Sequence, residues 1–332
     1  MFNGKRILVT GGTGSFGYEF VKYVLKNFNP QAIIVLSRDE MKQWEMAKKY
    51  PNEPRLRFFI GDVRDRDRLQ RAFNGVDYVV HAAATKIVPT AEYNPFECVK
   101  TNVQGAMNVV DAAIDNNLKG VVALSTDKAS SPINLYGATK LCSDKIFVAA
   151  NSYAGEYRTR FSVVRYGNVM CSRGSVIPLF TQQAKQNGEI TITDERMTRF
   201  MMSLSKAVEM VQYAFNDMVG GEIYVSKNPS MTITDIAKAV APQATIKTIG
   251  IRPGEKMHEQ MIGTEDAMYT YEYDNYYKIL PQIFDWWKDE KRIKTGKKVA
   301  ENFHYASDNN KQWMPVAELE QWLAENKDYI TI

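Results

Sequence analysis

Cysteine is scarce in this chain of 332 residues, which contains only Cys98, Cys142 and Cys171. Their number is odd and their spacing fits no metal-binding motif, so we expect neither a disulfide framework nor a metal site. We predict buried or inert thiols in a reducing compartment, and therefore a cytoplasmic protein.

Long hydrophobic runs are also missing. No apolar stretch approaches the roughly 20 residues that a membrane-spanning helix needs. The first residues, MFNGKRILVTGG, lead directly into a predicted strand and leave no room for a signal peptide. We therefore expect no membrane association.

Neither sign of charge dominates, because 42 basic and 38 acidic residues give a formal net charge of +4. The basic residues are scattered, apart from a run at 288–298 that we interpret as a solvated surface, and nothing indicates nucleic acid as a partner. The composition is that of an ordinary globular protein, 45% hydrophobic and 24% charged. The length suffices for one large domain and a smaller one.

The stretch LSTDKASSPINLYGATK (124–140) carries the most chemistry in the chain. Thr126, Asp127 and Lys128 place a hydroxyl, a carboxylate and an ammonium side by side. If 136–140 is helical, Lys140 lies one turn from Tyr136 on the same face. A nearby ammonium favours the phenolate, so we expect Lys140 to lower the pKa of Tyr136 from about 10 and make it a usable base.

A tyrosine and a lysine at this spacing are by themselves more often solvated surface residues. Here the pair follows an apolar, strand-like run at 120–125 and a Ser-Ser-Pro loop. Open α/β sheets place their active sites beyond the carboxyl ends of their strands, so this position favours a catalytic role.

Glycines recur every three residues near the N-terminus, where the apolar run at 6–10 breaks into GGTGSFG. Gly11, Gly14 and Gly17 are followed by a helical pattern. A strand, a glycine turn and a helix place a pyrophosphate on backbone amides at a helix N-terminus. A simple tight turn would leave the three-residue period unexplained, so we predict a dinucleotide site.

The residues after the second predicted strand (32–37) bear on the choice of cofactor. An NAD enzyme usually has an acidic residue at this strand end, whereas an arginine suits the 2′-phosphate of NADP. Asp39 complicates the choice, but Ser37, Arg38 and Lys42 together favour NADP. The alternative is an exposed, charged helix start.

Strand-like and helical segments alternate through the first half of the chain. The third strand is expected to end at Asp62, which meets the adenine edge with Val63 packing beside it, and His81 is expected as a hydrogen-bonded core residue. Asn102, on a predicted helix, is expected to bond the neighbouring strand. Six strands alternating with helices predict an α/β protein with a doubly wound parallel sheet. The strands after the second are predicted at 55–65, 76–84, 120–125 and 161–169, and the long helix at 95–117.

After residue 166 loops multiply and strand signals become short, although 221–226 could return to the sheet as a seventh strand. We predict a Rossmann-like cofactor-binding domain and a smaller, discontinuous C-terminal substrate-binding domain that caps the cleft. The first comprises 1–166 plus about 205–226, and the second 167–204 plus 227–332.

The motifs TGGTGSFG, GDVRD, HAAA, STDK, YGATK and RYGNV together resemble extended short-chain dehydrogenases/reductases that act on nucleotide sugars. More narrowly, AAATKIVPTAEYNP (82–95), RMTRFMM (196–202) and IRPGEKMHE (251–259) resemble the inverting UDP-N-acetylglucosamine 4,6-dehydratases of pseudaminic acid biosynthesis. The resemblance runs through nearly the whole chain. Ile87 departs from it, because the family pattern A-x-K-H-V-P has a histidine there.

The resemblance implies a lyase with tightly bound NADP. It converts UDP-N-acetylglucosamine to UDP-2-acetamido-2,6-dideoxy-β-L-arabino-hexos-4-ulose by oxidation at carbon 4, water loss across carbons 5 and 6, and hydride return to carbon 6, with inversion at carbon 5. Tyr136 takes the proton of the 4-hydroxyl, and Lys140 holds the phenolate and the cofactor ribose.

Many 4,6-dehydratases have an Asp-Glu pair after the threonine, whereas this chain has Asp127-Lys128. The resemblance therefore implies Lys128 as the base at carbon 5 and Asp127 as the acid at the 6-hydroxyl. A lysine base must be neutral, so its pKa is expected to fall through burial or beside Lys140.

The remaining predictions concern ligands and assembly. Arg252 suits the diphosphate, and Glu255 suits a ribose or sugar hydroxyl. No metal is expected, and family members commonly form oligomers from dimers to hexamers. Substrate contacts implied by the resemblance are Lys86, Asn168, Arg173, Val176, Thr198, Arg199, Arg252 and Glu255. Predicted cofactor contacts are Gly11, Thr13, Gly14, Ser15, Phe16, Gly17, Ser37, Arg38, Lys42, Asp62, Val63, Ala82, Ala83, Ala84, Lys86, Tyr136, Lys140 and Val169.

Three alternatives remain open. A retaining 4,6-dehydratase would give the D-xylo product, although many retaining relatives carry an N-terminal membrane region that is absent here. A UDP-sugar 4-epimerase needs Tyr136 and Lys140 but has no use for an acid–base pair at 127 and 128. An NADP-sensing regulatory protein needs no turnover, but such proteins often lose the tyrosine or the lysine, and both are present here.

Overall fold

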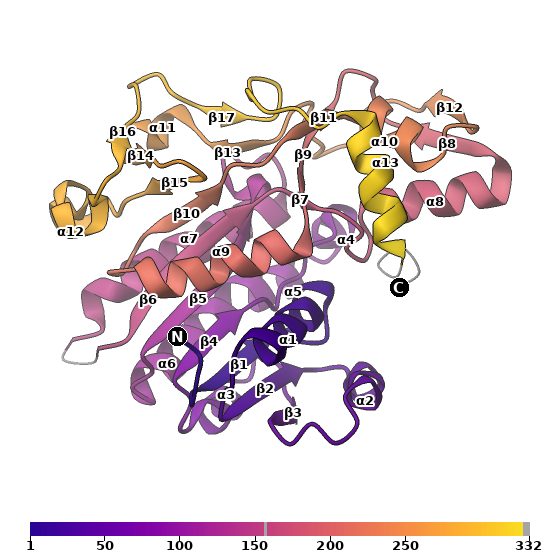
Figure 1. Cartoon of the computed structure of the whole chain (residues 1–332). Helices are drawn as coiled ribbons and strands as arrows, with labels where there is room; N and C mark the ends of the chain where they lie inside the picture. The colour runs from indigo at the N-terminus through magenta and orange to yellow at the C-terminus, as the bar shows by residue number, and fades with distance from the viewer. Residues whose placement is uncertain (156–157, 328–332) are drawn as a thin grey trace.

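A ten-stranded sheet dominates the computed structural model of the chain (Figure 1), which describes residues 1–155 and 158–327. Its order is β16-β14-β15-β10-β6-β5-β4-β1-β2-β3, and the strands from β10 to β3 run parallel. The order reverses between β1 and β4, where open α/β sheets bind their ligands. The parallel strands are β1 (Arg6–Thr10), β2 (Ala32–Ser37), β3 (Leu56–Ile60), β4 (Tyr78–His81), β5 (Gly120–Thr126), β6 (Arg160–Tyr166) and β10 (Ile223–Ser226).

Helices cover both faces of the sheet (Figure 1). On one face, Phe20 of α1 and Val208 of α9 belong to a buried cluster with Val9 of β1. On the other, Phe73 of α3 and Phe147 of α7 are buried with Leu8. Strands that are buried on both faces have nearly continuous apolar sequences, and β2 is an example. These helices are α1 (Ser15–Asn27) and α9 (Leu204–Asp217), and α3 (Arg66–Phe73), α6 (Gly105–Asp115) and α7 (Leu135–Tyr153), with α2 (Glu40–Lys49) beyond the end of β2.

The doubly wound α/β fold predicted from the sequence is thereby confirmed, including the seventh strand β10 and a helix over 136–140. The single strand predicted at 161–169 is wrong. Gly167 separates β6 from β7 (Asn168–Val169), which pairs with β9 in another sheet. A Cβ on Gly167 would lie 2.6 Å from the Cβ of Phe200, so the chain turns off the main sheet where only a glycine fits.

The helix predicted at 95–117 is interrupted rather than regular. It begins as α5 (Pro95–Val99), passes through a π-helical turn η1 (Lys100–Gln104) and continues as α6. A short helix α4 (Val88–Tyr93) precedes it. Turns of π-helix often occur at functional sites, and Asn102, in this turn, bonds the segment after β4.

A separate apolar cluster lies in the C-terminal half, in the upper right of Figure 1. It packs Phe180 of α8, Ile236 of α10 and Leu319 of α13 against Ile190 of β8. The predicted division into two domains stays a prediction. The elements here are β8 (Glu189–Ile192), β9 (Thr198–Met202), β11 (Ser230–Thr232), β12 (Thr245–Thr248), β13 (Gln260–Ile262), β17 (Tyr305–Ala306), α8 (Val176–Asn187), α10 (Ile233–Val240), α11 (Thr264–Ala267) and α13 (Val316–Glu325).

Part of the C-terminal half extends the main sheet. β15 (Tyr276–Ile279) pairs antiparallel with β10, and β14 (Thr270–Glu272) and β16 (Lys297–Lys298) follow it outward. The turns η3 (Ile283–Lys288) and α12 (Glu290–Ile293) connect β15 to β16. Within the described residues, no helix is long and apolar enough to span a bilayer.

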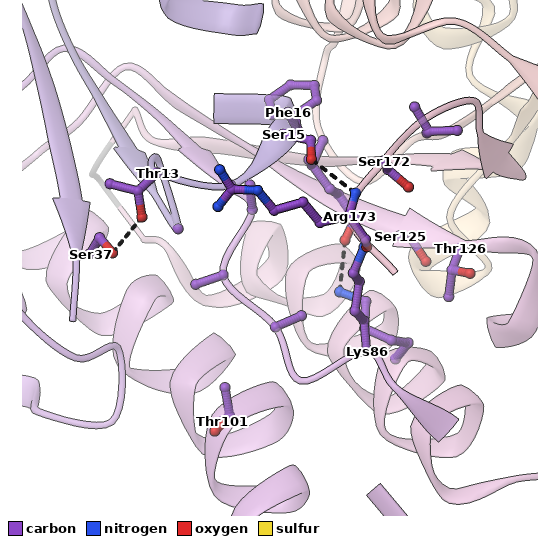
Figure 2. Close-up of a pocket in the computed structure, with 18 of the residues that line it drawn as sticks. Thr13, Ser15, Phe16, Ser37, Lys86, Thr101, Ser125, Thr126, Ser172 and Arg173 are labelled. Carbon is purple, nitrogen blue, oxygen red and sulfur yellow. Dashed lines mark hydrogen bonds between the residues drawn. The ribbon is translucent and has the colours of Figure 1, made fainter. Parts of the chain in front are cut away.

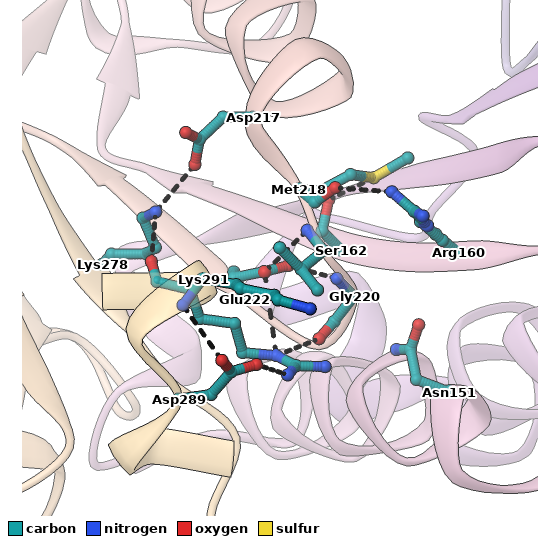
Figure 3. Close-up of polar contacts among 12 residues, drawn as sticks. Asn151, Arg160, Ser162, Asp217, Met218, Gly220, Glu222, Lys278, Asp289 and Lys291 are labelled. Atoms are coloured by element: carbon teal, nitrogen blue, oxygen red, sulfur yellow. Dashed lines mark hydrogen bonds and ion pairs between the residues drawn. The ribbon is translucent and has the colours of Figure 1, made fainter. Parts of the chain in front are cut away.

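A buried ion pair joins this extension to α9 (Figure 3). Lys278 is fully buried on β15, and its Nζ lies 2.7 Å from Asp217 Oδ2. Arg292 is also buried and pairs with Asp289, so the expectation of a solvated run at 288–298 is wrong at this position. Of the three cysteines, Cys142 is exposed and the other two are buried.

We predict that Asp217→Ala lowers the free energy of unfolding by about 3–5 kcal/mol, because it leaves the buried Lys278 ammonium without its carboxylate. Urea denaturation measures this. Asp111→Ala, which breaks the surface pair with Arg66, is the control and should have little effect. Equal effects of the two variants would contradict the account.

Candidate active site

A cavity of about 930 Å³ opens beyond the carboxyl ends of the parallel strands and is shown in part in Figure 2. It extends from the glycine turn after β1 to the end of β5. Most predicted cofactor contacts line it, together with residues that we did not anticipate. Those unanticipated residues are Leu36, Asp39, Gly61, Thr101, Leu124, Ser125, Tyr166, Gly167, Ser172 and Leu204.

The glycine turn has the shape of a phosphate cradle. Gly11 has φ +63°, and a Cβ on it would lie 2.9 Å from the backbone of Ala83 on the adjoining strand end. A Cβ on Gly17 would lie 2.1 Å from the carbonyl oxygen of Gly12. Gly14 is the N-cap of α1 and makes no side-chain cap. The first N–H groups of α1 are therefore available to an anion, as a dinucleotide pyrophosphate requires.

The end of β2 explains the role of Asp39. Its carboxylate caps α2 by accepting from the Lys42 backbone N–H at 3.0 Å, and it also pairs with Lys42 Nζ at 2.9 Å. Ser37 and Thr13 share a hydrogen bond of 2.8 Å between their hydroxyls (Figure 2). Arg38 is largely exposed, and its guanidinium lies 3.5 Å from Asp62.

The loop after β7 lines the cavity and places Arg173 between Ser15 and Lys86 (Figure 2). The Arg173 backbone N–H donates to Ser15 Oγ at 3.2 Å, and the Arg173 carbonyl accepts from Lys86 Nζ at 2.9 Å. The two predicted substrate contacts Lys86 and Arg173 therefore meet directly beside the glycine turn.

Asn102 fixes the chain after β4, as predicted. Its side-chain amide exchanges hydrogen bonds with both backbone groups of Thr85, at 2.8 and 2.9 Å, and donates to Thr139 Oγ1 at 3.0 Å. His81 is buried and bonds Thr10 at 2.9 Å. Burial lowers the pKa of His81 to about 3, so it is a neutral core residue.

The acid–base candidates follow β5 in a 3₁₀ turn, η2 (Asp127–Ala129). Asp127 is 1% exposed, and its Oδ1 accepts from Thr126 Oγ1 at 2.9 Å and from Lys128 Nζ at 3.1 Å. Glu259, 2% exposed, places its Oε1 2.9 Å from the same Nζ. One ammonium thus lies between two buried carboxylates.

The electrostatics of this cluster overturn one expectation. Burial acts to lower the pKa of Lys128, but Asp127 and Glu259 outweigh it and raise this pKa above its ordinary value. The expected fall is therefore wrong for the ligand-free protein, in which Lys128 is an ammonium. Burial, together with repulsion from Glu259, raises the pKa of Asp127. Burial also acts to raise the pKa of Glu259, but Lys128 and Arg199 hold it low.

Tyr136 and Lys140 both lie on α7 and line the cavity, yet the expected effect of Lys140 on the phenol is also wrong here. Burial raises the pKa of Tyr136 to about 12, opposed by the Lys128 ammonium and the Thr126 hydroxyl. Lys140 Nζ donates to the carbonyl of Leu124 at 2.7 Å instead. Burial lowers the pKa of Lys140.

The structure thus gathers every predicted cofactor contact except Gly17 around this cavity, along with Asn168, Arg173 and the five catalytic candidates. The cavity formed by the described residues does not include the substrate candidates Val176, Thr198, Arg199, Arg252 and Glu255. Thr198 Oγ1 bonds His258 and Ser307, at 2.8 and 2.6 Å. Among the described residues, no cluster of three metal-ligating side chains occurs.

A doubly wound sheet, a glycine cradle and a Tyr-x-x-x-Lys pair at the strand ends define a protein of the short-chain dehydrogenase/reductase type. The chain belongs to the family described as "Polysaccharide biosynthesis protein", which matches residues 7–281.

Individual relatives narrow this class. The chain is 55% identical over 325 residues to a UDP-N-acetylglucosamine 4,6-dehydratase (inverting) of Campylobacter jejuni, covering 96% of this chain and 97% of that protein. This confirms the resemblance found in the sequence. It is also 43% identical over 337 residues to a UDP-glucose 4-epimerase of Rickettsia bellii, covering 99% and 98%.

Solved structures share the fold. Pen from Bacillus thuringiensis superposes with a TM-score of 0.91 at 36% identity, covering 98% of this chain and 99% of that one. DesIV, a dTDP-glucose 4,6-dehydratase of Streptomyces venezuelae with NAD bound, gives a TM-score of 0.69 at 25% identity, covering 76% and 86%.

We predict that Lys128→Met lowers the free energy of unfolding by about 3–5 kcal/mol at pH 8, because two buried carboxylates then face each other without their cation. The loss should shrink towards pH 5. Without the ammonium the folded-state pKa of each carboxylate rises above its unfolded value, so protonation at low pH relieves the strain.

Urea denaturation at both pH values measures the effect of Lys128→Met. Lys100→Met, which breaks the exposed pair with Glu97, is the control. An equal loss at pH 5 and pH 8 would contradict the description of the cluster.

Proposed function

We propose that this chain is a lyase that removes water from UDP-N-acetylglucosamine, with inversion at carbon 5, to form UDP-2-acetamido-2,6-dideoxy-β-L-arabino-hexos-4-ulose. The observation that carries the proposal is the pair Asp127–Lys128 on the cavity wall beside Tyr136. A 4-epimerase has no step for such an acid–base pair. The 55% identity to an inverting dehydratase of this substrate supports the same reading.

The epimerase alternative has its own support in the 43% identity to a UDP-glucose 4-epimerase. The two reactions share oxidation at carbon 4 and differ in their later steps. An epimerase returns hydride to the same carbon, whereas a dehydratase must first remove a proton from carbon 5 and a hydroxyl from carbon 6. The alternatives can therefore be separated by their products.

The residues at the cavity fit a nicotinamide dinucleotide, because the glycine cradle leaves space and free N–H groups for a pyrophosphate. DesIV, a structural relative, holds NAD. We propose NADP for this chain. Asp39 is occupied as a helix cap, while Arg38 is exposed at the end of β2, where a 2′-phosphate would lie.

The bound nicotinamide would accept hydride from carbon 4 and return it to carbon 6. Tyr136 receives the proton of the 4-hydroxyl, so its phenol must first ionise. Lys128 and Thr126 assist this in the ligand-free protein, since both lower the pKa of Tyr136. Lys140 lies one helical turn further along α7.

The ketone at carbon 4 acidifies the proton on carbon 5. Lys128 takes this proton in its amine form, and Asp127 in its acid form gives a proton to the 6-hydroxyl, which leaves as water. A proton from solvent then returns to carbon 5 from the opposite face, which inverts that centre. The protein gives one proton back to solvent when Tyr136, Asp127 and Lys128 return to their starting protonation states, so water is the only net loss from the sugar.

Location and assembly remain proposals as well. The reducing cytoplasm suits a chain with three free cysteines. Large apolar side chains are exposed on α4 and α5, with Tyr93 89% and Phe96 79% accessible, which is consistent with assembly into a homo-oligomer.

Proton NMR of the purified protein with UDP-N-acetylglucosamine in deuterated water tests the function. We expect a new methyl signal at carbon 6 and deuterium at carbon 5, with ring couplings of the L-arabino product. Lys128→Met should lower the rate of methyl formation by about 100-fold or more. The denatured protein should release NADP rather than NAD.

Other products would redirect the assignment. Ring couplings of the D-xylo sugar would identify a retaining dehydratase. Signals of UDP-N-acetylgalactosamine alone, with no methyl signal, would establish the epimerase. An unchanged spectrum with a range of UDP-sugars, despite bound NADP, would favour a regulatory protein.

A further inference from the structure

Glu259 is the second carboxylate on Lys128, and it comes from a different part of the chain. Asp127 adjoins Lys128 on the turn after β5, whereas Glu259 directly precedes β13. Their oxygens lie 3.1 and 2.9 Å from Lys128 Nζ. The side chain of Lys128 is 25% exposed and lines the cavity, while both carboxylates are buried behind it.

The backbone holds Glu259 in place. Its N–H donates to Ser307 Oγ at 2.9 Å, and its carbonyl accepts from the Ser307 N–H at 2.8 Å. The preceding residue, His258, bonds Thr198. Glu259 therefore reaches the ammonium from a frame tied to β9 and β17, which does not depend on the turn that carries Asp127.

One oxygen of each carboxylate in this cluster lacks a hydrogen bond. Among the described residues, neither Asp127 Oδ2 nor Glu259 Oε2 has a hydrogen-bond partner, although both atoms are buried. Leaving buried carboxylate oxygens unpaired costs stability. Buried ionisable groups that cost stability in this way are typical of functional sites.

We propose that Glu259 is a positioning residue for proton removal at carbon 5, and that it holds Lys128 Nζ at the cavity wall and keeps one proton shared between Lys128 and Asp127. This rests on the proposed dehydratase function. The sequence motifs alone did not indicate that Glu259 contacts the Asp127–Lys128 pair.

Proton sharing follows from the geometry. In the resting protein the proton is on Lys128, and dehydration requires an amine at Lys128 and an acid at Asp127. Transfer from Nζ to Asp127 Oδ1 across their 3.1 Å contact produces that state without a net change in protonation. The negative charge of Glu259 opposes loss of this proton from either partner, so the pair keeps it to higher pH.

Other charged and titratable groups near the Asp127–Lys128 pair also affect the pKa values of this cluster. Arg199 Nε lies 3.8 Å from Glu259 Oε1, and Lys256, whose Nζ donates to the Ser130 carbonyl at 2.6 Å, lies close enough to act on the pKa of Glu259. The Tyr136 phenol also faces Lys128. These groups remain in a Glu259 variant, so the change on substitution reports the Glu259 carboxylate.

Glu259→Gln removes the charge and keeps the shape. Absorbance of reduced nicotinamide on mixing with UDP-N-acetylglucosamine reports oxidation at carbon 4, and NMR of the new methyl group reports passage through carbon 5. We expect the first rate within about threefold of the unaltered protein and the second lowered about 100-fold, since misplacing a reacting group costs about that much. Both limbs of the pH profile for methyl formation should move to lower pH.

Two further variants keep the test decisive. Glu259→Asp retains the charge but shortens the reach, so it should slow methyl formation while the pH limbs stay in place. The Glu259→Asp variant therefore tests the proposal even if Glu259→Gln does not fold. The control is Glu222→Gln, a buried carboxylate that accepts from the N–H groups of Val219 and Gly220 (Figure 3). Glu222 precedes β10, so it lies at the opposite end of that strand from the cavity and does not line it. It should change neither the ratio of the two rates nor the pH profile.

Several results would overturn the inference. Glu259→Gln with wild-type rates would do so, as would an equal slowing of both steps with unmoved pH limbs, which indicates a purely structural role. Glu259→Asp with an unaltered rate would do the same. If the unaltered protein forms no methyl signal, the proposed function fails and this inference fails with it. A methyl signal together with any of the preceding results refutes only the role of Glu259.

Discussion

The pairing of Lys128 with two buried carboxylates is the interaction on which the site depends. It joins the turn after β5 to the segment before β13, so the sheet and the C-terminal half meet at one ammonium. Two buried carboxylates so close together would repel each other without the cation between them. The same contact keeps Lys128 at the cavity wall and determines where the proton of the cluster resides.

This arrangement keeps both proposed bases protonated in the ligand-free protein. Lys128 is an ammonium and Tyr136 a neutral phenol, because carboxylates surround the first and burial dominates the second. In the proposed reaction both groups act as bases, so substrate and cofactor must change the charge distribution in the cavity before either step. Lys128 also lowers the pKa of the Tyr136 phenol, which links the two proposed steps.

Local patterns were sufficient to predict much of the fold and one wall of the site. Apolar runs located the parallel strands, and the three-residue glycine period located the cradle at Gly11. The break at Gly167 was missed, because it arises from contact with Phe200, which is distant in sequence. Glu259 lies in the IRPGEKMHE motif, but its contact with Lys128 was missed for the same reason. The pKa shifts of Tyr136 and Lys128 depend on burial and on partners across the fold, which spacing along a helix does not report.

We propose that the Asp127–Lys128–Glu259 cluster acts on carbons 5 and 6 of the hexose. A crystal structure of the protein with bound cofactor and UDP-N-acetylglucosamine would show whether it does. We expect carbon 5 about 3–3.5 Å from Lys128 Nζ, the 6-hydroxyl within hydrogen-bond reach of Asp127, and Glu259 still paired with the ammonium. A hexose bound with carbons 5 and 6 facing away from Lys128, or Nζ released from Glu259 and turned out of the cavity, would contradict it.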